Sequence, residues 1–188
     1  MSKRYGAILA DPPWQFKAYS GPRLPSRVAD AHYATMPFDD IAAMPIASAL
    51  AADRCALFMW VVDSHLDQGI ELMRRWGFEF KTLAFVWVKT CKSDPSRPRM
   101  GMGLWTRKSA EICLMGTRGK VSRQDKGVHQ TIMEPRRQHS RKPDEIYERI
   151  ERLVDGPYLE MFARQSWPGW DAWGNETDKF EARDVKCS

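Results

Sequence analysis

The sequence predicts an α/β protein with a mostly parallel, twisted sheet flanked by helices. Short apolar runs alternate along the chain with segments of helical spacing, as in strands joined by helical crossovers. The first apolar run ends directly at an acid, two prolines and a tryptophan, residues 11–14. With 188 residues, of which 43% are hydrophobic and 28% charged, the chain is long enough for one domain with a substantial core.

The first part of the chain contains two predicted strands separated by a loop and by helical sequence. Tyr5–Ala10 is predicted to be a buried strand, and residues 15–34, rich in Ser, Pro, Gly and Arg, a loop. Phe38–Ala52 is predicted to form one or two short helices. Ala56–Val62 is a continuous apolar run, which is typical of a strand covered on both faces.

A helix is predicted over residues 63–76. Leu66, Ile70 and Met73 recur at helical spacing and would form one apolar face. Gly77 follows as the expected C-cap, because glycine readily adopts the left-handed conformation that ends many helices.

The middle of the chain combines strands with two basic loops. Strands are predicted at Phe80–Val88 and Glu111–Met115, with a short one at Thr131–Met133. The basic segments 89–108 and 117–130 are predicted to be loops. Loops of this length in a small domain are usually functional or disordered.

The last part of the chain resembles a crossover unit followed by a tail. A helix is predicted at 143–153, with proline and acidic residues in its first turn. Residues 156–157 form a predicted turn, and Tyr158–Ala163 the next strand. Residues 167–176 are aromatic and rich in turn residues, and the charged segment 177–188 is expected to be flexible. The domain is therefore expected to span residues 1–176.

Charge is distributed unevenly along the chain. The formal net charge is +5, yet residues 89–142 contain fourteen Lys and Arg residues and four Asp and Glu residues. A positive region of this kind favours a polyanionic partner such as nucleic acid. The alternative is a solvated surface loop.

No sequence pattern indicates a metal site, a signal peptide or a membrane span. The cysteines at 55, 91, 113 and 187 form no Cys-x-x-Cys pair, and the histidines show no ligand spacing. Cys55 and Cys113 lie in apolar runs and are expected to be reduced core residues. We expect a cytoplasmic protein without a metal, since the longest apolar run is far too short to span a bilayer.

The segment Asp11-Pro12-Pro13-Trp14 is the strongest candidate site. Proline has no N–H, so the carbonyls of Asp11 and Pro12 cannot pair with the residue that follows each of them. A carboxylate, two carbonyls left to accept other hydrogen bonds and a flat indole could bind a planar ligand with an amino group. An aminopurine or aminopyrimidine base fits this description. Taken alone, the same residues could also form an ordinary turn.

Further motifs decide between these interpretations because they occur in a fixed order with the tetrapeptide. They are His32-Tyr33-Ala34-Thr35-Met36, Leu57-Phe58-Met59-Trp60-Val61, Trp87-Val88-Lys89-Thr90, Ser140-Arg141-Lys142-Pro143-Asp144-Glu145-Ile146-Tyr147, Leu159-Glu160-Met161-Phe162-Ala163-Arg164, and Gly169-Trp170 through Gly174-Asn175-Glu176. This ordered set, over residues 5 to about 176, resembles the adenine-6-amino methyltransferases named after the seventy-kilodalton subunit of the messenger-RNA methylase. The resemblance resolves the turn alternative in favour of a functional site.

The resemblance implies a Rossmann-like fold, S-adenosylmethionine as cofactor and a permuted motif order, with the catalytic tetrapeptide before the cofactor strand. The catalytic residues would be Asp11, Pro12, Pro13 and Trp14. The cofactor contacts implied are Asp11, Lys142, Glu160, Arg164, Asn175 and Glu176. Trp14 and Tyr33 would stack on the base, and the basic residues Lys89, Arg97, Arg99, Arg107 and Lys108 are candidates for contact with the substrate.

The sequence departs from the family pattern at two positions on the cofactor side. Ala163 stands where the strand motif usually has glycine, and Glu176 where an amide is common. Both put the affinity and geometry of cofactor binding in question. The family's frequent acid upstream of the tetrapeptide also has little room, because ten residues precede Asp11.

The expected function is transfer of a methyl group to the 6-amino group of adenine in nucleic acid, with DNA favoured over RNA. The compact chain without added RNA-binding modules favours a bacterial or phage-type enzyme. One alternative is a non-catalytic partner that holds nucleic acid in a heterodimer, although such partners typically lose the acidic tetrapeptide. Another is a non-catalytic nucleotide-binding protein. A homodimer or a heterodimer is compatible with each of these functions.

Overall fold

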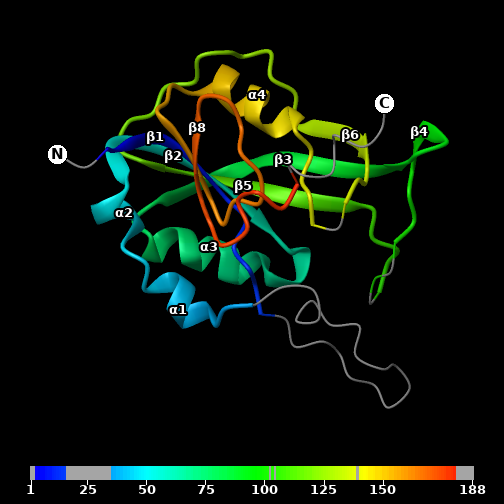
Figure 1. The fold of residues 1–188 in the computed structure, drawn as a ribbon, viewed down its shortest axis with the longest axis horizontal. Helices are drawn as coiled ribbons and strands as arrows, with labels where there is room; N and C mark the ends of the chain where they lie inside the picture. The colour runs from blue at the N-terminus through cyan, green and yellow to red at the C-terminus, as the bar shows by residue number, and fades with distance from the viewer. Residues whose placement is uncertain (1–2, 16–34, 102, 104, 139, 181–188) are drawn as a thin grey trace.

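The computed structural model contains one eight-stranded sheet with helices on both faces (Figure 1). It describes residues 3–15, 35–101, 103, 105–138 and 140–180. The strands follow the order β4-β3-β5-β2-β1-β7-β8, and β6 pairs with β3 beside this path. The strands are β1 (Tyr5–Ala10), β2 (Ala51–Val61), β3 (Glu79–Cys91), β4 (Asp94–Pro98), β5 (Ala110–Arg118), β6 (Thr131–Pro135), β7 (Tyr158–Met161) and β8 (Trp170–Trp173). The helices are α1 (Phe38–Ala42), α2 (Ile46–Ala49), α3 (Leu66–Arg75), α4 (Glu145–Leu153) and a 3-10 turn at Asp63–His65.

Strand β1 lies near the centre of the sheet, between β2 and β7 and parallel to both. Its side chains alternate between two cores, because successive residues of a strand point to opposite faces. Ile8 and Ala10 belong to one core, and Ala7 and Leu9 to the other. A strand buried on both faces must be apolar throughout, which explains the uninterrupted run that predicted it.

Helices α1, α2 and α3 cover one face of the sheet, and α4 covers the other (Figure 1). Ile41, Leu72 and Trp76 are fully buried on the first face, where the Trp76 indole donates a hydrogen bond of 2.9 Å to the Ile41 carbonyl. On the second face Ile146 and Ile150 of α4 pack into the other core. The crossovers from β1 to β2 and from β6 to β7 therefore lie on opposite faces.

The sheet is mixed, and its parallel pairings outnumber its antiparallel ones, since β1–β2, β1–β7, β3–β6 and β7–β8 are parallel. Strand β5 runs antiparallel to both β2 and β3, and β4 is antiparallel to β3. No helix separates β3, β4 and β5, and a chain that returns without a crossover must pair antiparallel. The α/β class with flanking helices is confirmed.

Part of the segment 89–108 is strand rather than loop. Strand β3 continues to Cys91 and forms a hairpin with β4, in which Thr90 pairs with Pro98. The prolines at 95 and 98 argue against a central strand but are tolerated at a sheet edge, where β4 lies. The predicted helical segment 38–52 consists of α1 and α2, and its last two residues already belong to β2.

Strand β8 was not predicted, because its sequence is short and surrounded by turn residues. It pairs in parallel with β7, with Tyr158 opposite Trp170.

The structure describes the charged tail only as far as residue 180, where Phe180 is buried. Cys55 and Cys113 are fully buried and free of disulfides, as predicted. None of the helices in the described part of the chain is long and apolar enough to cross a membrane.

The C-cap glycine of α3 provides a test of the local backbone. Gly77 has a φ of +82°, and a Cβ added to it would lie 2.8 Å from the Cβ of Ala47. We predict that Gly77→Ala lowers the free energy of unfolding by about 1–2 kcal/mol or more in urea denaturation, because the left-handed backbone and the contact with Ala47 both oppose the new methyl group. Gly169→Ala is the matched control, since Gly169 has the same φ and open space around it. Equal losses in both variants would mean that the Ala47 contact contributes nothing.

Candidate active site

A cavity of about 430 Å³ opens at the edge of the sheet where β1 ends. This is the edge at which parallel strands of α/β proteins present ligand sites. Asp11 and Pro12 follow β1, while Trp60 and Lys89 lie near the ends of β2 and β3. The cavity volume is within the range of small-molecule sites, roughly 300–1,000 Å³.

Three residues of the tetrapeptide are held by hydrogen bonds to neighbouring segments. The Asp11 N–H donates to the Met161 carbonyl of β7 at 3.4 Å, and the Pro13 carbonyl accepts from the Met36 N–H at 2.9 Å. The Trp14 indole donates to the Trp60 carbonyl of β2 at 3.2 Å. The segment thus joins the ends of β7 and β2, which fixes the position of the Asp11 side chain.

The Pro12 carbonyl is not left entirely unpaired, contrary to the prediction from sequence. It accepts a hydrogen bond of 2.8 Å from the Trp14 N–H, because the chain turns back within two residues. A carbonyl oxygen has two lone pairs, so one acceptor position remains.

Trp14 is a wall residue and not an open stacking platform. Its side chain is 4% exposed, belongs to the core beneath the sheet and contributes only a small part of its surface to the cavity. Trp60, 2% exposed, also lines the cavity, and its indole N–H has no hydrogen-bond partner among the described residues. A buried donor of this kind is available to a ligand acceptor.

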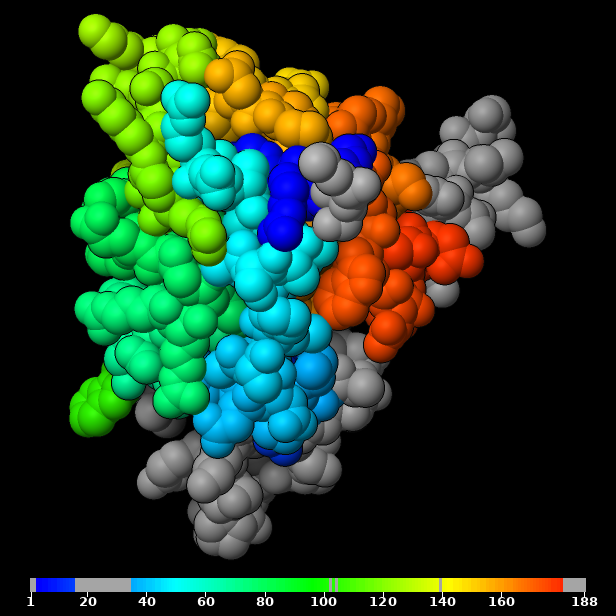
Figure 2. Space-filling model, turned by 90° about the vertical axis from the view of Figure 1, so that its left-hand side faces the viewer, coloured from blue at the N-terminus to red at the C-terminus, as the bar shows by residue number. Residues whose placement is uncertain are grey.

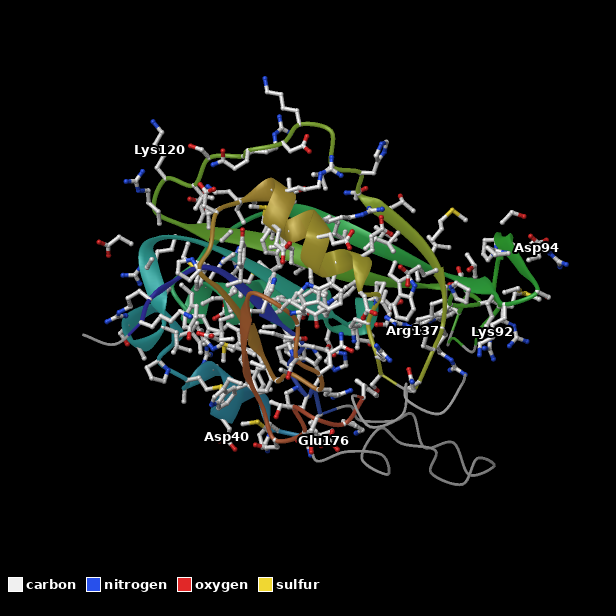
Figure 3. All side chains as sticks on the ribbon, turned by 45° about the horizontal axis from the view of Figure 1, so that its top comes forward. Asp40, Lys92, Asp94, Lys120, Arg137 and Glu176 are labelled. Carbon is white, nitrogen blue, oxygen red and sulfur yellow. The ribbon has the colours of Figure 1, made fainter. Side chains whose placement is uncertain are left out.

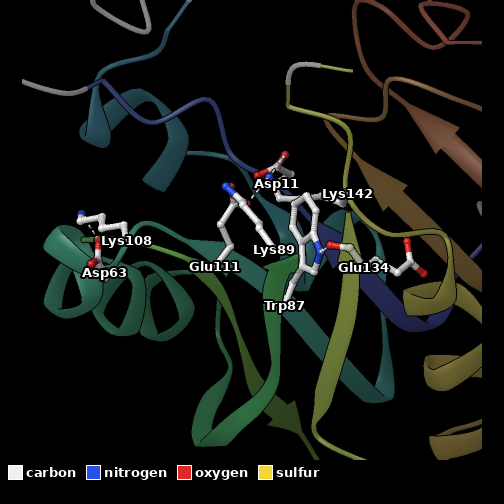
Figure 4. A network of polar contacts seen from close by, with 8 residues as sticks. All are labelled: Asp11, Asp63, Trp87, Lys89, Lys108, Glu111, Glu134 and Lys142. Atoms are coloured by element: carbon white, nitrogen blue, oxygen red, sulfur yellow. Dashed lines mark hydrogen bonds and ion pairs between the residues drawn. The ribbon is translucent and has the colours of Figure 1, made fainter. Parts of the chain in front are cut away.

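Alternating charges form a network on the cavity wall (Figure 4). The Lys142 Nζ lies 2.8 Å from the Asp11 Oδ2 and 3.3 Å from the Glu111 Oε2. Lys89 forms an ion pair with the same Glu111. Asp11 and Lys142 are each 19% exposed, so each charge depends on its partner more than a surface charge would.

The network keeps its lysine and glutamate charged. Burial alone would raise the pKa of Glu111, but Lys142 and Lys89 lower it to about 2. Burial opposes the charge on Lys142 as well, whereas Asp11 and Glu111 raise its pKa above the ordinary range. Both groups are therefore ionised throughout the physiological pH range.

Glu111 is a site residue that sequence reasoning missed. It lies at the start of an apolar strand, and the expected mostly parallel sheet would have placed that strand end at the far edge. Because β5 is antiparallel, its first residues lie at the same edge as the end of β1. The signal in the sequence that could have found Glu111 is an acidic residue at one end of a predicted buried strand, whichever end that is.

A smaller recess of about 20 Å³ adjoins the cavity and shares Asp11, Lys142 and Arg164 with it. Glu160 at the end of β7 lines this recess and accepts a hydrogen bond of 2.8 Å from the Tyr147 hydroxyl. Gln165 lines it too, with its Oε1 atom buried and unpartnered among the described residues.

The structure brings together four of the predicted cofactor residues, Asp11, Lys142, Glu160 and Arg164. The other two, Asn175 and Glu176, follow β8 and do not line either cavity. Glu176 lies next to the site through Arg164, whose Nε is 3.9 Å from its carboxylate, and it pairs with Lys179 at 2.6 Å.

Ala163 does not require the backbone of the glycine that the family pattern usually places there. The left-handed conformation falls one residue earlier, at Phe162 with a φ of 60°. Gly174 passes close to Ala163, since an added Cβ would lie 2.5 Å from the Ala163 carbonyl oxygen. Ser140, with a φ of 65°, lines the same recess as Phe162. Two non-glycine residues in this sparsely populated region are typical of a functional site.

The predicted substrate residues fall into different places. Lys89, Arg99 and Lys108 line the cavity, whereas Arg97 and Arg107 are exposed near it in sequence. Lys108 pairs with Asp63 at the start of the 3-10 turn (Figure 4). Tyr33 lies outside the described residues.

The basic segment 117–130 lies away from the cavity. Strand β5 carries the chain from the cavity edge to the opposite edge, so Lys120 is at the far end of the molecule from Lys92 and Arg137 (Figure 3). Figure 2 looks onto that opposite edge, where this segment stands out in yellow-green. None of its residues lines the cavity.

The recess generates a prediction about pH. Burial, reinforced by the charge of Asp11, raises the pKa of Glu160 to about 7, although the Tyr147 hydroxyl, Lys142 and Arg164 oppose the shift. Glutamate in the unfolded chain loses its proton near its ordinary pKa of 4.5, so between pH 4.5 and 7 the folded state binds more protons and stability falls as pH rises. Glu160→Gln removes this effect. Its gain in unfolding free energy over wild type should grow from pH 4.5 to 7, reaching at most about 3 kcal/mol.

Urea denaturation at several pH values checks this prediction, with the exposed Glu148→Gln on the same helix–strand unit as the matched control. A gain that does not change between pH 4.5 and 7 would contradict the raised pKa.

Comparisons with known proteins agree with this geometry. A family model described as MT-A70 matches residues 5–176. The chain is 31% identical over 191 residues to the Type II methyltransferase M.MunI of a Mycoplasma species, covering 93% of this chain and 78% of that protein. It is 30% identical to an N(6)-adenosine-methyltransferase MT-A70-like protein of Drosophila melanogaster and 31% identical to the human N(6)-adenosine-methyltransferase catalytic subunit METTL3. In both cases 93% of this chain is covered, but only 27% and 28% of the relative. The chain belongs to the MT-A70 family of S-adenosylmethionine-dependent methyltransferases.

Proposed function

We propose that this protein methylates the 6-amino group of adenine in DNA. The methyltransferase class, the adenine target and the cofactor follow from family membership. The choice of DNA over RNA is the finer part of the proposal. Assembly into a homo- or heterodimer stays a prediction.

Among the relatives reported above, this chain spans 78% of the Type II methyltransferase M.MunI but only about a quarter of the N(6)-adenosine-methyltransferases. We take the likeness to the Type II methyltransferase as support for DNA as the substrate. The cavity also carries a strong positive charge, since seven Lys and Arg residues and three acidic residues line it. That balance suits a polyanion.

A single observation carries the proposed chemistry, namely the Asp11 carboxylate at the cavity wall, held by Lys142 through one oxygen. The lone pair of the adenine 6-amino nitrogen is delocalised into the ring, which makes the amine a poor nucleophile. The other oxygen of Asp11 and the second lone pair of the Pro12 carbonyl can accept the two N–H groups and draw the nitrogen towards tetrahedral geometry. Positive charge that develops on the nitrogen is then stabilised by the carboxylate.

The residues around the recess fit S-adenosylmethionine. The cofactor supplies an electrophilic methyl group on a positively charged sulfur. Lys142 and Arg164 offer positive charge for its carboxylate, and Glu160 offers negative charge for its amine. The buried Oε1 of Gln165, which has no hydrogen-bond partner among the residues that the structure describes, is a further acceptor for an ammonium group.

Transfer of a labelled methyl group to unmethylated genomic DNA, to single-stranded DNA and to RNA, followed by nucleoside analysis, tests the proposal. N6-methyladenine formed most rapidly in DNA is the expected result. Faster labelling of RNA would overturn the choice of DNA.

We predict that Asp11→Asn lowers the rate of methyl transfer by at least about 100-fold, because the amide carries no negative charge to stabilise the developing positive charge. The fold should persist, since Lys142 keeps Glu111 as an ion-pair partner at 3.3 Å. The measurement is initial rate on genomic DNA, with circular dichroism as the folding check.

Asp171→Asn is the matched control for Asp11→Asn. Asp171 makes its ion pair with Lys3, and neither residue lines the cavity. A rate near wild type in Asp11→Asn would contradict the role of the carboxylate.

The three arginines of the segment 97–107, of which Arg99 lines the cavity, generate a second prediction. The triple variant Arg97→Gln, Arg99→Gln, Arg107→Gln should bind DNA more weakly and reduce the slope of log K against log salt concentration by about 2–3, close to one for each phosphate that is no longer neutralised. Fluorescence anisotropy over a salt series measures both quantities.

The control set is Lys120→Gln, Arg123→Gln, Lys126→Gln, which removes the same charge from exposed residues that do not line the cavity. An equal change in both triple variants would mean that net charge alone determines binding.

A further inference from the structure

The side chain of Trp105 is 94% exposed, the highest value among the large apolar residues of the described chain. Tryptophan is usually buried over most of its surface, because its ring system is large and mainly apolar. The proposed chemistry makes no use of this residue. Its exposure therefore needs a separate explanation.

Trp105 lies on a loop at the mouth of the cavity, here called the rim loop, whose described residues are 99–101, 103 and 105–109. Arg99, Gly101 and Lys108 of this loop line the cavity. Between β4 and β5 the chain projects away from the sheet (Figure 1). The loop therefore connects the cavity wall with a side chain that faces solvent.

The base of the rim loop is fixed by hydrogen bonds at both ends. The Arg99 N–H donates to the Lys89 carbonyl at 2.7 Å, and the Lys89 N–H donates to the Ser109 carbonyl at the same distance. The Gly101 N–H donates to the Lys108 carbonyl at 2.8 Å. A pinned base holds the position from which Trp105 extends.

The loop keeps Trp105 close to the cavity. Trp105 is three residues from Lys108, which lines the cavity, and a fully extended chain spans that separation in at most about 10 Å. A base held in the cavity would therefore leave its stack within reach of the indole.

Charge favours a nucleic acid over a second copy of this chain as the partner. Arg107, two residues after Trp105, and Arg97 of β4 are exposed, and seven Lys and Arg residues but only three acidic residues line the neighbouring cavity. Two copies meeting at this surface would oppose positive charge with positive charge. Phosphates and bases instead satisfy both the cations and the indole.

We propose that Trp105 stacks against the bases next to the target adenine and occupies the space that this adenine leaves in the duplex. The inference rests on the proposed function. The reacting nitrogen must reach Asp11 inside the cavity, so an adenine in a duplex has to leave the stack, at a cost in free energy. An aromatic side chain that stacks on the neighbouring bases replaces part of the stacking that is lost.

The test compares two duplexes that differ only in the free-energy cost of moving the target adenine out of the stack. Wild-type enzyme first methylates unmethylated genomic DNA, and sequencing of the modified adenines defines an oligonucleotide target. The target is then prepared as a paired duplex and as a duplex with an abasic site opposite the adenine, where the base is already unpaired. The variants are Trp105→Ala and Trp105→Phe, with Met133→Ala as a control at an exposed apolar residue of β6.

We expect Trp105→Ala to lower methylation of the paired duplex by about tenfold and that of the abasic duplex by less than about twofold. Trp105→Phe should retain most of the activity because phenylalanine also stacks, and Met133→Ala should match wild type. Equal losses on both duplexes would overturn the proposal in favour of a contact with the target adenine itself or a structural role. No loss on either duplex would overturn it as well.

Two further outcomes are distinguishable from these. Wild-type enzyme that methylates RNA but no DNA contradicts the proposed substrate, whatever Trp105 does. A wild-type dimer in sedimentation that Trp105→Ala converts to a monomer would overturn the inference and assign the indole to contact with a second copy.

Discussion

The ion pair between Lys142 and Asp11 joins two segments that are 131 residues apart in the chain. Asp11 immediately follows the central strand β1, and Lys142 lies three residues before the start of the crossover helix α4. Each side chain is 19% exposed, so neither charge could be left there without its partner. Glu111 and Lys89 extend the alternation of charge to β5 and β3, and the cavity wall thus depends on one connected network. Lys142 and Asp11 line both the large cavity and the smaller recess. This one ion pair therefore lies between the two parts of the site.

The direction of β5 decides which acid belongs to this network. Its nine residues span about 30 Å at roughly 3.3 Å per residue. Were β5 parallel to its neighbours, Glu111 would lie near the opposite edge and Lys142 would have one carboxylate partner fewer. The direction of β5 also separates the two basic segments. The strand begins beside the cavity and ends at the opposite edge of the sheet, where residues 119–130 follow it. Charge that is continuous in the sequence is therefore divided between two surfaces.

The backbone around the site combines rigid anchors with local strain. The tetrapeptide is tied to β7, β2 and Met36 by hydrogen bonds, so its rigidity comes from neighbours as well as from its two prolines. Phe162 and Ser140 adopt left-handed backbone conformations where the recess forms. The alanine at 163 is accommodated because Phe162, and not residue 163, makes the sharp turn. Asp11 and Glu160 both lie at strand ends but in different surroundings. Asp11 lines the cavity and the recess, whereas Glu160 lines only the recess.

The sequence alone determined the α/β class, the central strand, the acid that ends it and the family, because each depends on local patterns or on motifs in a fixed order. Those motifs also predicted Lys142, Glu160 and Arg164 as cofactor contacts, and the structure brings these three residues to the recess beside Asp11. Only the tertiary structure decided what depends on contacts between distant segments, since residue spacing carries no information about strand direction without a crossover. These include the antiparallel β5, the place of Glu111 in the charge network and the burial of Trp14, whose indole donates to the Trp60 carbonyl. They also include the edge strands β4 and β8, whose prolines and turn residues resemble a loop until a neighbouring strand pairs with them.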